Sequence, residues 1–500
     1  MKGIFSLVTA FLAAGAAAGP LRTKAAPVSQ IECAGMSFTY ESLAGYGRLA
    51  GNFVDKYGDT MSIGSGISIT EWKPVEGGAF EATMFVLPDR GWNTEGTTAY
   101  QPRVHQLALT FTPTDAAVSA PNIEYRYRDT ILLTDPAGNP VAGLDPNTVL
   151  EYPGFPAMPA AAFPGDGFGG EGPGGVRVAL DSEGLVVDRV SDEEGFWISD
   201  EYGPFLYHFN KKGEMTKAVR PPNSLIPIRN GKEDFGSNNP PRFDPTLVPS
   251  PEDPTSGRAN NQGFEGLTYA KDENALYTLL QSATINNGGT SDETSRYSTL
   301  LKYQLDKDGK NPTLAGEWTV PLPQYTATTG EKFTAAQSSI LSLGKGRFMV
   351  IARDGDAGRG QSSTESIYRH VDVFSIAEAT NFVGKYDGYT DAYAPGGVLD
   401  ASIKPAEYCS FLDINNNSEL AKFGLLNGGS DNNADGLLNE KWEGLSMVPA
   451  GREGEYYLFV SNDNDFITQD GHYNFGKYAY ADESGFDLYS QMLVFKVKID

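Results

Sequence analysis

The segment that decides the fold reads Glu443-Gly444-Leu445, followed by a polar stretch and then by Tyr457-Leu458-Phe459-Val460-Ser461-Asn462-Asp463. The same triplet occurs twice more, and each copy is followed by a polar stretch and an apolar run that ends in polar or charged residues. These copies are Glu183-Gly184-Leu185 with the run 195–201, and Glu265-Gly266-Leu267 with the run 275–282. A pattern that recurs along a chain indicates a repeat architecture.

Two weaker copies extend the pattern to five units. Residues 64–67 lead to the apolar run 84–91, and residues 338–341 lead to the run 348–355. Another alternating segment follows each run, as at 299–303. Each unit therefore reads as strand, turn, strand, turn, strand, which is typical of a β-propeller blade. We predict an all-β chain that forms a single β-propeller. Five units are visible and six blades are expected, the sixth within the irregular stretches.

Two long stretches interrupt the repeats. Residues 153–175 are rich in Pro, Gly and Ala, residues 221–261 are rich in Pro, Asn and Asp, and neither shows a periodic apolar pattern. We expect both to be loops, and loops of this length in a compact domain are often functional covers. The propeller domain is expected to span residues 19–500 with these Pro/Gly-rich loops as inserts.

The first residues have the features of a secretion signal. Lys2 precedes the apolar run 4–12, and small residues follow up to Ala18. This arrangement predicts a signal peptide over residues 1–18 and a secreted, extracellular mature protein. No later apolar run reaches the length of a membrane-spanning helix, so no membrane contact is expected once the signal is removed.

The two cysteines of the chain are Cys33 and Cys409. In an oxidising compartment their simplest arrangement is one disulfide, although free buried thiols and pairing between chains remain as alternatives. A Cys33–Cys409 bridge would join the start of the chain to a segment near its end and close the ring of blades. Asn416 begins the sequon Asn416-Asn417-Ser418 and is a candidate glycosylation site.

The charge of the chain excludes several classes of partner. The 39 Lys and Arg residues against 64 Asp and Glu give a net charge of −25, and no basic run occurs. Such a chain repels phosphate backbones and anionic lipids, so neither nucleic acid nor a membrane is expected as a partner. The excess carboxylates either bind hard cations or keep a secreted protein soluble. We expect a monomer whose partner is a small molecule.

Acidic and basic residues follow the apolar runs, at positions that converge on one face of a propeller. The triplet glutamates lie at the start of the preceding strands, so a ring of carboxylates is expected from Asp89, Glu183, Asp200, Glu265, Asp354 and Glu443. Unpaired carboxylates raise one another's pKa and repel. Calcium, which takes six to eight oxygen ligands, is the natural counter-ion. Alternatively, the Glu-Gly pair recurs because the glycine adopts a positive-φ turn and the glutamate hydrogen-bonds to nearby backbone.

A second, separate calcium candidate is Asp431-Asn432-Asn433-Ala434-Asp435-Gly436, which resembles the first half of an EF-hand loop. Trp442 stands where that loop would supply its last glutamate, so a polar turn is an equally good interpretation. Other chemistries find no support in the sequence. The chain has no Gly-x-Ser-x-Gly elbow, dinucleotide fingerprint or Walker loop, and its four histidines show no metal-ligand spacing.

With these residues laid out, the chain resembles the phytase-like family described as "esterase-like activity of phytase". The resemblance runs through most of the mature chain, and the matching stretches are 87–92, 196–204, 263–267, 352–354, and 442–445 with 460–465. The family is similar to secreted or periplasmic propellers, and its name implies hydrolysis of phosphate esters.

The resemblance implies a role for each residue of the face. Calcium would be the cofactor, and the metal ligands would be Glu183, Asp200, Glu265, Asp354, Glu443 and Asp463. The catalytic residues would be Asp89, Arg90, Glu201 and Arg353, and the two arginines would also bind the anionic group of a small ester substrate.

Lys and Arg are sparse near these motifs, which favours a simple phosphomonoester or phosphodiester over a highly phosphorylated inositol. Two other interpretations stay open. One is a calcium-dependent lactonase or carboxylic esterase, and the other is a non-catalytic propeller that binds a ligand.

Overall fold

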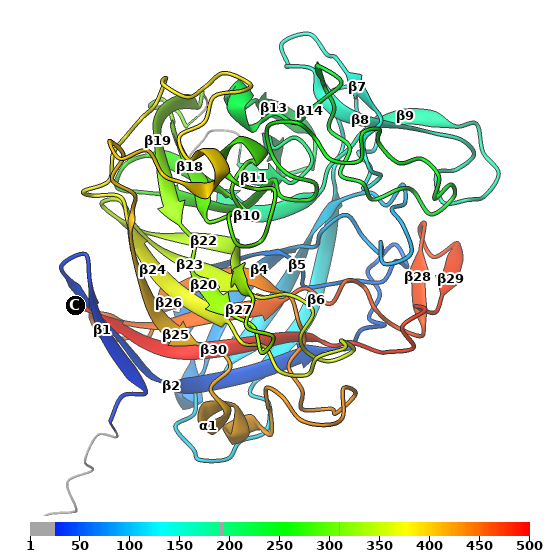
Figure 1. Ribbon diagram of the computed structural model, residues 1–500. Coiled ribbons are helices and arrows are strands. Elements are labelled where there is room, and N and C mark those ends of the chain that lie inside the picture. The colour runs from blue at the N-terminus through cyan, green and yellow to red at the C-terminus, as the bar shows by residue number, and fades with distance from the viewer. Residues whose placement is uncertain (1–25, 190–193, 310) are drawn as a thin grey trace, which may run out of the picture.

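The computed structural model describes residues 26–189, 194–309 and 311–500, and these residues form a nearly all-β protein (Figure 1). The predicted signal peptide, residues 1–18, lies outside the described residues. The helical elements of the described residues are short: α1 (Asn417–Leu420), η1 (Glu76–Gly78), η2 (Asn223–Leu225), η3 (Ile285–Asn287), η4 (Pro395–Gly397) and η5 (Ala421–Phe423). None of the described helices is long and apolar enough to cross a membrane.

Five antiparallel sheets of four or five strands contain most of the strands. Four of them consist of consecutive strands. Their strands are β3 (Gly66–Pro74), β4 (Phe80–Leu87), β5 (Arg103–Phe111) and β6 (Ile123–Leu132); β10 (Ser182–Asp188), β11 (Gly195–Asp200), β12 (Leu206–Asn210) and β13 (Met215–Val219); β16 (Phe264–Ala270), β17 (Ala275–Leu280), β18 (Tyr297–Gln304) and β19 (Thr313–Pro321); and β22 (Ala336–Gly344), β23 (Arg347–Arg353), β24 (Arg369–Ser375) and β25 (Glu407–Asp413).

The fifth sheet combines both ends of the chain. Its strand order is β26 (Trp442–Pro449), β27 (Glu455–Asn462), β30 (Ser490–Ile499), β2 (Met36–Leu49) and β1 (Ser29–Cys33). The remaining strands form small sheets: β7 (Thr148–Leu150), β8 (Met158–Phe163) and β9 (Gly175–Val178); β14 (Ile228–Arg229) and β15 (Lys232–Glu233); β20 (Gln324–Thr326) and β21 (Lys332–Thr334); and β28 (Gly471–Tyr473) and β29 (Tyr478–Tyr480).

The strands expected from the five repeats are confirmed. The structure adds one outer strand to each of the first four units and two, β2 and β1, to the last. Strand β6 escapes the pattern because it is largely half-buried or exposed; it reads Ile-Glu-Tyr-Arg-Tyr-Arg-Asp-Thr-Ile-Leu with few fully buried positions. The described residues contain no sixth four-stranded sheet, because the irregular stretches form loops and the small sheets instead. The insert 153–175 is also not wholly a loop, since it contains β8, which pairs with β7 and β9.

The first strands of the five large sheets contact one another in cyclic order. Strand β3 contacts β10, β10 contacts β16, β16 contacts β22, β22 contacts β26, and β26 contacts β3. Buried apolar side chains fill the space between neighbouring sheets. For example, Met84, Leu107, Phe459 and Val494 belong to one buried cluster that joins the β3 sheet to the β26 sheet. The five first strands therefore surround a common centre.

The glycine of each Glu-Gly-Leu triplet allows this close approach. A Cβ atom on Gly184 would lie 2.6 Å from the Leu267 Cβ and 2.7 Å from the Glu265 carbonyl oxygen of the next sheet. The three triplet glycines, Gly184, Gly266 and Gly444, are not among the residues with positive φ. The positive-φ interpretation of the repeat is therefore wrong, and the glycine is needed because a neighbouring strand occupies the space of a side chain.

We expect Gly184→Ala to lower the free energy of unfolding by about 2 kcal/mol, because overpacking against a rigid backbone forces strands β10 and β16 apart. Gly355→Ala is the matched control, since its Cβ would meet only the Glu440 carboxylate, at 3.5 Å. Chemical denaturation of both variants measures the difference. Equal stability of the two variants would contradict the close-packing role of the triplet glycine.

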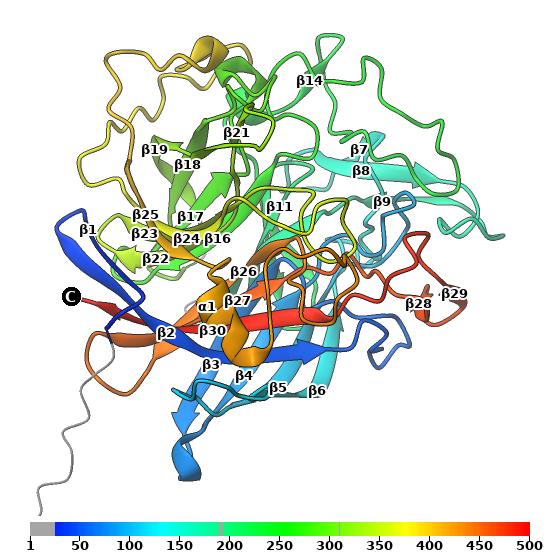
Figure 2. The ribbon, with the colours of Figure 1, turned by 60° about the horizontal axis from the view of Figure 1, so that its bottom comes forward.

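The two ends of the chain are joined by backbone pairing. Strand β2 pairs with β30 over its whole length, and the blue and red strands lie side by side in Figures 1 and 2. The predicted disulfide is confirmed, since Cys33 and Cys409 are bonded. It links β1 to β25, the outer strands of two neighbouring sheets. It therefore joins the start of the chain to a segment near its end, as predicted, and the pairing of β2 with β30 joins the two chain ends within one sheet.

Removing the disulfide with Cys33→Ser and Cys409→Ser is expected to lower the free energy of unfolding by about 3 kcal/mol, because the bridge restrains a long loop of the unfolded chain. Because the bridge links outer strands, the double variant should keep the packing of the inner strands. Denaturant titration with and without reducing agent tests this expectation. A parent protein that reducing agent does not destabilise would contradict it.

Asn416 caps the N-terminus of α1. Its Oδ1 accepts hydrogen bonds from the backbone N–H groups of Ser418 and Glu419, at 3.0 and 3.4 Å. The side chain is half-buried. Glycosylation at Asn416 stays a prediction.

Candidate functional site

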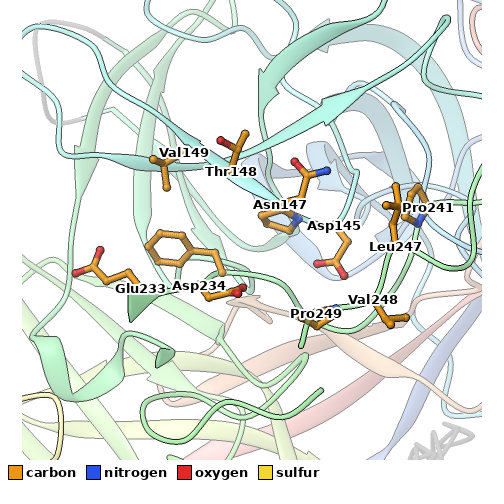
Figure 3. A pocket seen from close by; sticks show the side chains of 12 residues that line it. Asp145, Asn147, Thr148, Val149, Glu233, Asp234, Pro241, Leu247, Val248 and Pro249 are labelled. Atoms are coloured by element: carbon orange, nitrogen blue, oxygen red, sulfur yellow. The ribbon is translucent and has the colours of Figure 1, made fainter. Parts of the chain in front are cut away.

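Two pockets of similar size differ in their chemistry. The first, about 400 Å³, lies between β7 and the 221–261 insert (Figure 3). Its carboxylates already have protein partners: Asp145 accepts hydrogen bonds from the backbone N–H groups of Ser237 and Asn239, Asp234 pairs with Arg229, and Glu233 pairs with Arg220. Its other walls are mostly proline, valine and leucine. This pocket shows no arrangement that suits catalysis.

The second pocket, about 390 Å³, lies where the inner strands of the sheets meet. Carboxylates dominate its lining: Asp89, Glu183, Glu201, Glu265, Asp292, Asp354, Asp356 and Glu443. The lining also contains three cations, Arg90, Arg353 and Lys441, and two aromatic rings, Tyr325 and Phe333. The structure thus brings eight of the ten predicted site residues to one pocket wall, all except Asp200 and Asp463. We call this the acidic pocket.

β-Bulges direct the triplet glutamates toward the acidic pocket. The register of β16 with β17 shifts between Phe264 and Gly266, and that of β26 with β27 shifts between Trp442 and Gly444. The glutamate between each pair is the extra residue of the bulge, and a bulge turns a side chain out of the regular alternation. Glu183 lies in the corresponding irregularity of β10. This local feature explains why the triplet recurs.

The triplet glutamates differ in their partners. Glu443 pairs with Arg353 at 2.7 Å and lies 3.8 Å from the Lys441 ammonium. Burial alone would raise the pKa of Glu443, but Lys441 and Arg353 hold it below its ordinary value. Glu443 is therefore an ionised carboxylate that the chain itself neutralises.

Glu183 and Glu265 have no ion-pair partner among the described residues. Burial and the Glu265 and Asp181 carboxylates raise the pKa of Glu183 well above its ordinary value. Burial and the Glu443 and Glu201 carboxylates do the same for Glu265. Oε1 of Glu265 accepts a hydrogen bond from Gln281, but its buried Oε2 has no partner. Neither carboxylate is therefore neutralised by a direct ion pair with the described residues.

Asp89 belongs to two clusters of three carboxylates. In one it lies with Asp463 and Asp465, in the other with Asp181 and Glu183, and within each cluster the ligand oxygens lie within 4.8 Å of one another. Burial and the Asp181 carboxylate raise the pKa of Asp89 to about 7. Burial likewise raises the pKa of Asp181 to about 7 and that of Asp463 to about 8.

Arg90 and Glu201 lie beside the second cluster with unused polar atoms. Arg90 pairs through Nη1 with Asp181, while its buried Nε has no acceptor. Burial raises the pKa of Glu201 to about 7, although Arg90 opposes the shift. Oε1 of Glu201 and Oδ1 of Asp181 are buried and accept no hydrogen bond from the described residues. Such atoms are costly unless a ligand satisfies them.

Two predicted metal ligands instead hold loops in place. Asp200 accepts hydrogen bonds from the backbone N–H groups of Asp181, Tyr202 and Gly203, and it does not line the acidic pocket. Asp354 lines the pocket but accepts hydrogen bonds from the Ser366 hydroxyl and the loop that follows it. Their oxygens already serve protein donors, so these two carboxylates are poorly suited to bind a metal.

Sequence reasoning missed Asp181 and Lys441. Each lies two positions before a triplet glutamate, as in Asp181-Ser182-Glu183 and Lys441-Trp442-Glu443. Because side chains in a strand alternate with a period of two, these positions share a face with the glutamate. That signal could have found them. The hairpin β20–β21, which supplies Tyr325 and Phe333, carried no recognisable signal.

The EF-hand-like stretch uses its side chains for protein contacts. Asp435 pairs with Arg48 at 2.9 Å, and the Asn433 Oδ1 accepts a hydrogen bond from Arg359 at 3.0 Å. None of its residues belongs to a candidate metal cluster in the described part of the chain. These contacts favour the polar-turn interpretation.

Two solved structures share only a distant likeness with the chain. One is an N-acetylgalactosamine deacetylase from F. plautii, with 10% identity and a TM-score of 0.33 over 92% of this chain and 95% of that one. The other is a virginiamycin B lyase from Staphylococcus aureus, with 9% identity and a TM-score of 0.26 over 91% of this chain and 99% of that one. Likeness at this level does not bear on function.

A protein of Arthroderma benhamiae is much more similar. It is 44% identical over 469 residues, which is 89% of this chain and 90% of that protein, and its name is "uncharacterized secreted protein". That name and the Cys33–Cys409 disulfide confirm the predicted secreted, extracellular location. Residues 81–466 match the family described as "esterase-like activity of phytase". This match covers most of the chain, including the acidic pocket, and the chain therefore belongs to the phytase-like family.

Proposed function

We propose that the protein is a secreted, calcium-dependent phosphoric ester hydrolase that acts as a monomer on a small anionic ester. In this proposal the five large sheets form a five-bladed β-propeller, and the acidic pocket opens on one of its faces. Family membership supports a hydrolase. The observation that carries the proposal is the set of buried, unpartnered carboxylate oxygens of Glu201 and Glu265, which line the acidic pocket, and of Asp181, which forms a cluster with the pocket residues Asp89 and Glu183.

The donor set suits a hard cation. Calcium takes several oxygen ligands in flexible geometry, and carboxylates are its usual protein ligands. Asp89, Asp181 and Glu183 would hold the ion, since their oxygens lie within 4.8 Å of one another. Arg90 pairs with Asp181, and the Lys441 ammonium lies 3.8 Å from Asp89. When bound, calcium supplies the positive charge that neutralises a phosphate group in this acidic pocket.

The side chains then have distinct tasks. Glu201 Oε1 is free to accept the proton of the attacking water, and a pKa of about 7 suits a general base at neutral pH. The water oxygen bonds to phosphorus as the bond to the ester oxygen breaks, and the released alcohol takes a proton from solvent. Arg90 Nε is a buried donor without a partner, so it can stabilise the charge that develops on phosphate.

The organic part of the ester would contact the aromatic wall. Tyr325 and Phe333 are stacked with ring centroids 5.6 Å apart, and both line the acidic pocket. Arg353 and Lys441 are already paired with carboxylates. The pocket thus offers little free positive charge for a substrate with many phosphates, and a simple phosphate ester fits it better than phytate.

A carboxylic ester is the second candidate, because Arg353 and Lys441 are occupied and an uncharged ester needs fewer cations. Two substrates with the same leaving group, p-nitrophenyl phosphate and p-nitrophenyl acetate, separate the candidates. The proposal predicts that only phosphate ester hydrolysis is rapid and depends on calcium. Calcium-dependent hydrolysis of the acetate alone would favour an esterase, and hydrolysis of neither would favour a protein that binds a ligand without catalysis.

A further inference from the structure

The two carboxylate clusters that share Asp89 have the arrangement of a site for two cations. Asp463 and Asp465 form one cluster with Asp89, and Asp181 and Glu183 form the other. In two-metal hydrolases the two ions together stabilise the attacking and the leaving oxygen. The question is which cations these two clusters take.

The chain itself supplies a cation to the first cluster. The Lys441 ammonium lies 2.8 Å from Asp465 and 3.8 Å from Asp89, and it also lies 3.8 Å from Glu443. Its side chain is three-quarters buried, with 24% of its surface exposed. Lys441 precedes β26, so the backbone of that strand fixes its position. The ammonium group therefore lies among the carboxylates of this cluster.

The second cluster shares Asp89 with the first, but no ammonium group of the described residues pairs with Asp181 or Glu183. Arg90 reaches Oδ2 of Asp181, but Oδ1 of Asp181 is buried without a hydrogen-bond partner, and Glu183 forms no ion pair with the described residues. Arg90 neutralises part of the charge of Asp181, and a divalent cation would neutralise the rest of this cluster. The two halves of the site thus differ in how the chain balances their charge.

We propose that Lys441 takes the place of a second metal ion, so that the acidic pocket binds one divalent cation, at Asp89, Asp181 and Glu183. The inference rests on the proposed function, because it assigns the cations of the same site. An ammonium group is a compact point charge with three donors. It can neutralise Asp89 and Asp465 permanently, whereas the divalent ion can exchange.

Counting bound calcium tests the inference directly. Isothermal titration of the full-length mature protein should give one site per chain for the parent and for Lys477→Gln, in which an exposed lysine that pairs with Asp166 is removed instead. Lys441→Gln should bind two calcium ions, because its first cluster loses the built-in cation. One site in Lys441→Gln, or two sites in the parent, would overturn the inference while leaving the proposed function intact. No site in the folded parent would refute the calcium-dependent function itself.

A second pair of variants keeps the inference testable if Lys441→Gln does not fold. Asp465→Asn removes a carboxylate from the cluster of Lys441, and Asp181→Asn removes one from the other cluster. We expect Asp465→Asn to keep the single calcium site within about threefold of the parental affinity, and Asp181→Asn to weaken it at least about tenfold. Equal weakening in the two variants, or a larger effect of Asp465→Asn, would overturn the assignment.

Discussion

Asp89→Asn is expected to lower kcat/KM for a phosphate monoester by at least about a thousandfold. Asp89 belongs to both carboxylate clusters, so the substitution weakens the calcium site and also removes a negative charge next to Lys441. Its fold should survive, because asparagine has nearly the same shape and its Oδ1 can still accept the hydrogen bond that Asn93 donates to Asp89 at 3.3 Å. Steady-state kinetics at saturating calcium measure the loss.

Asp356→Asn is the control for this prediction. Asp356 lies exposed at the rim of the acidic pocket, and its φ of 58° is a conformation that asparagine also tolerates. The control removes the same charge from the pocket but touches neither cluster, so its kcat/KM should stay within about tenfold of the parent. Similar losses in the two variants would show that net charge, rather than the Asp89 clusters, determines activity.

The second large effect concerns stability without calcium. The free energy of unfolding of the calcium-free protein should fall by at least about 3 kcal/mol between pH 5 and pH 8. The pKa of Asp89 is raised from 3.8 to about 7 in the folded protein, with burial as the main cause. The folded state therefore holds a proton that the unfolded state releases above pH 4. The contribution of Asp89 to the free energy of unfolding is therefore lost as the pH rises toward 7. The raised pKa values of Glu201 and Asp463 lower the free energy of unfolding over the same range.

Calcium should remove most of this pH dependence, because the ion neutralises the same carboxylates without protons. Glu317→Gln serves as the control. Burial and Asp387 raise the pKa of Glu317 to about 8, but Glu317 does not line the acidic pocket. In Glu317→Gln the free energy of unfolding should depend less on pH than in the parent. Calcium should still suppress the part of the pH dependence that comes from the acidic pocket. Denaturant titrations at pH 5 and pH 8 decide the point, and parallel pH profiles with and without calcium would contradict it.

The sequence pattern predicted the inner strands well because their signal is local. The apolar run after each triplet is visible within a few residues, so Glu265 and Glu443 could be placed at the starts of strands from the sequence alone. The reason for the triplet glycine could not be found in this way, because Gly184 packs against Leu267 of the next sheet. The outer strands such as β6 were missed because they bury few side chains. The pairing of β2 with β30 was missed because it depends on residues more than 400 positions apart.

Part of the candidate site could also be predicted, because the residues that follow the apolar runs are visible in the local sequence pattern. Residues after the apolar runs, such as Asp89 and Arg353, do line the acidic pocket. Asp200 also follows an apolar run, but it accepts hydrogen bonds from the backbone N–H groups of Tyr202 and Gly203 instead of lining the pocket. The sequence pattern does not show where those N–H groups point. Lys441 could have been found from strand alternation. Its position among three carboxylates, however, follows from how neighbouring sheets meet, which the sequence pattern does not contain.

The most direct test of the account is a calcium-removal experiment on the purified mature protein. The protein is stripped with a chelator, dialysed, and assayed with p-nitrophenyl phosphate before and after calcium is added back. Hydrolysis should be lost when calcium is removed. It should return as calcium is added back and reach its full rate at one calcium ion per chain. Full phosphate ester hydrolysis by protein that is free of calcium and of other divalent ions would contradict it.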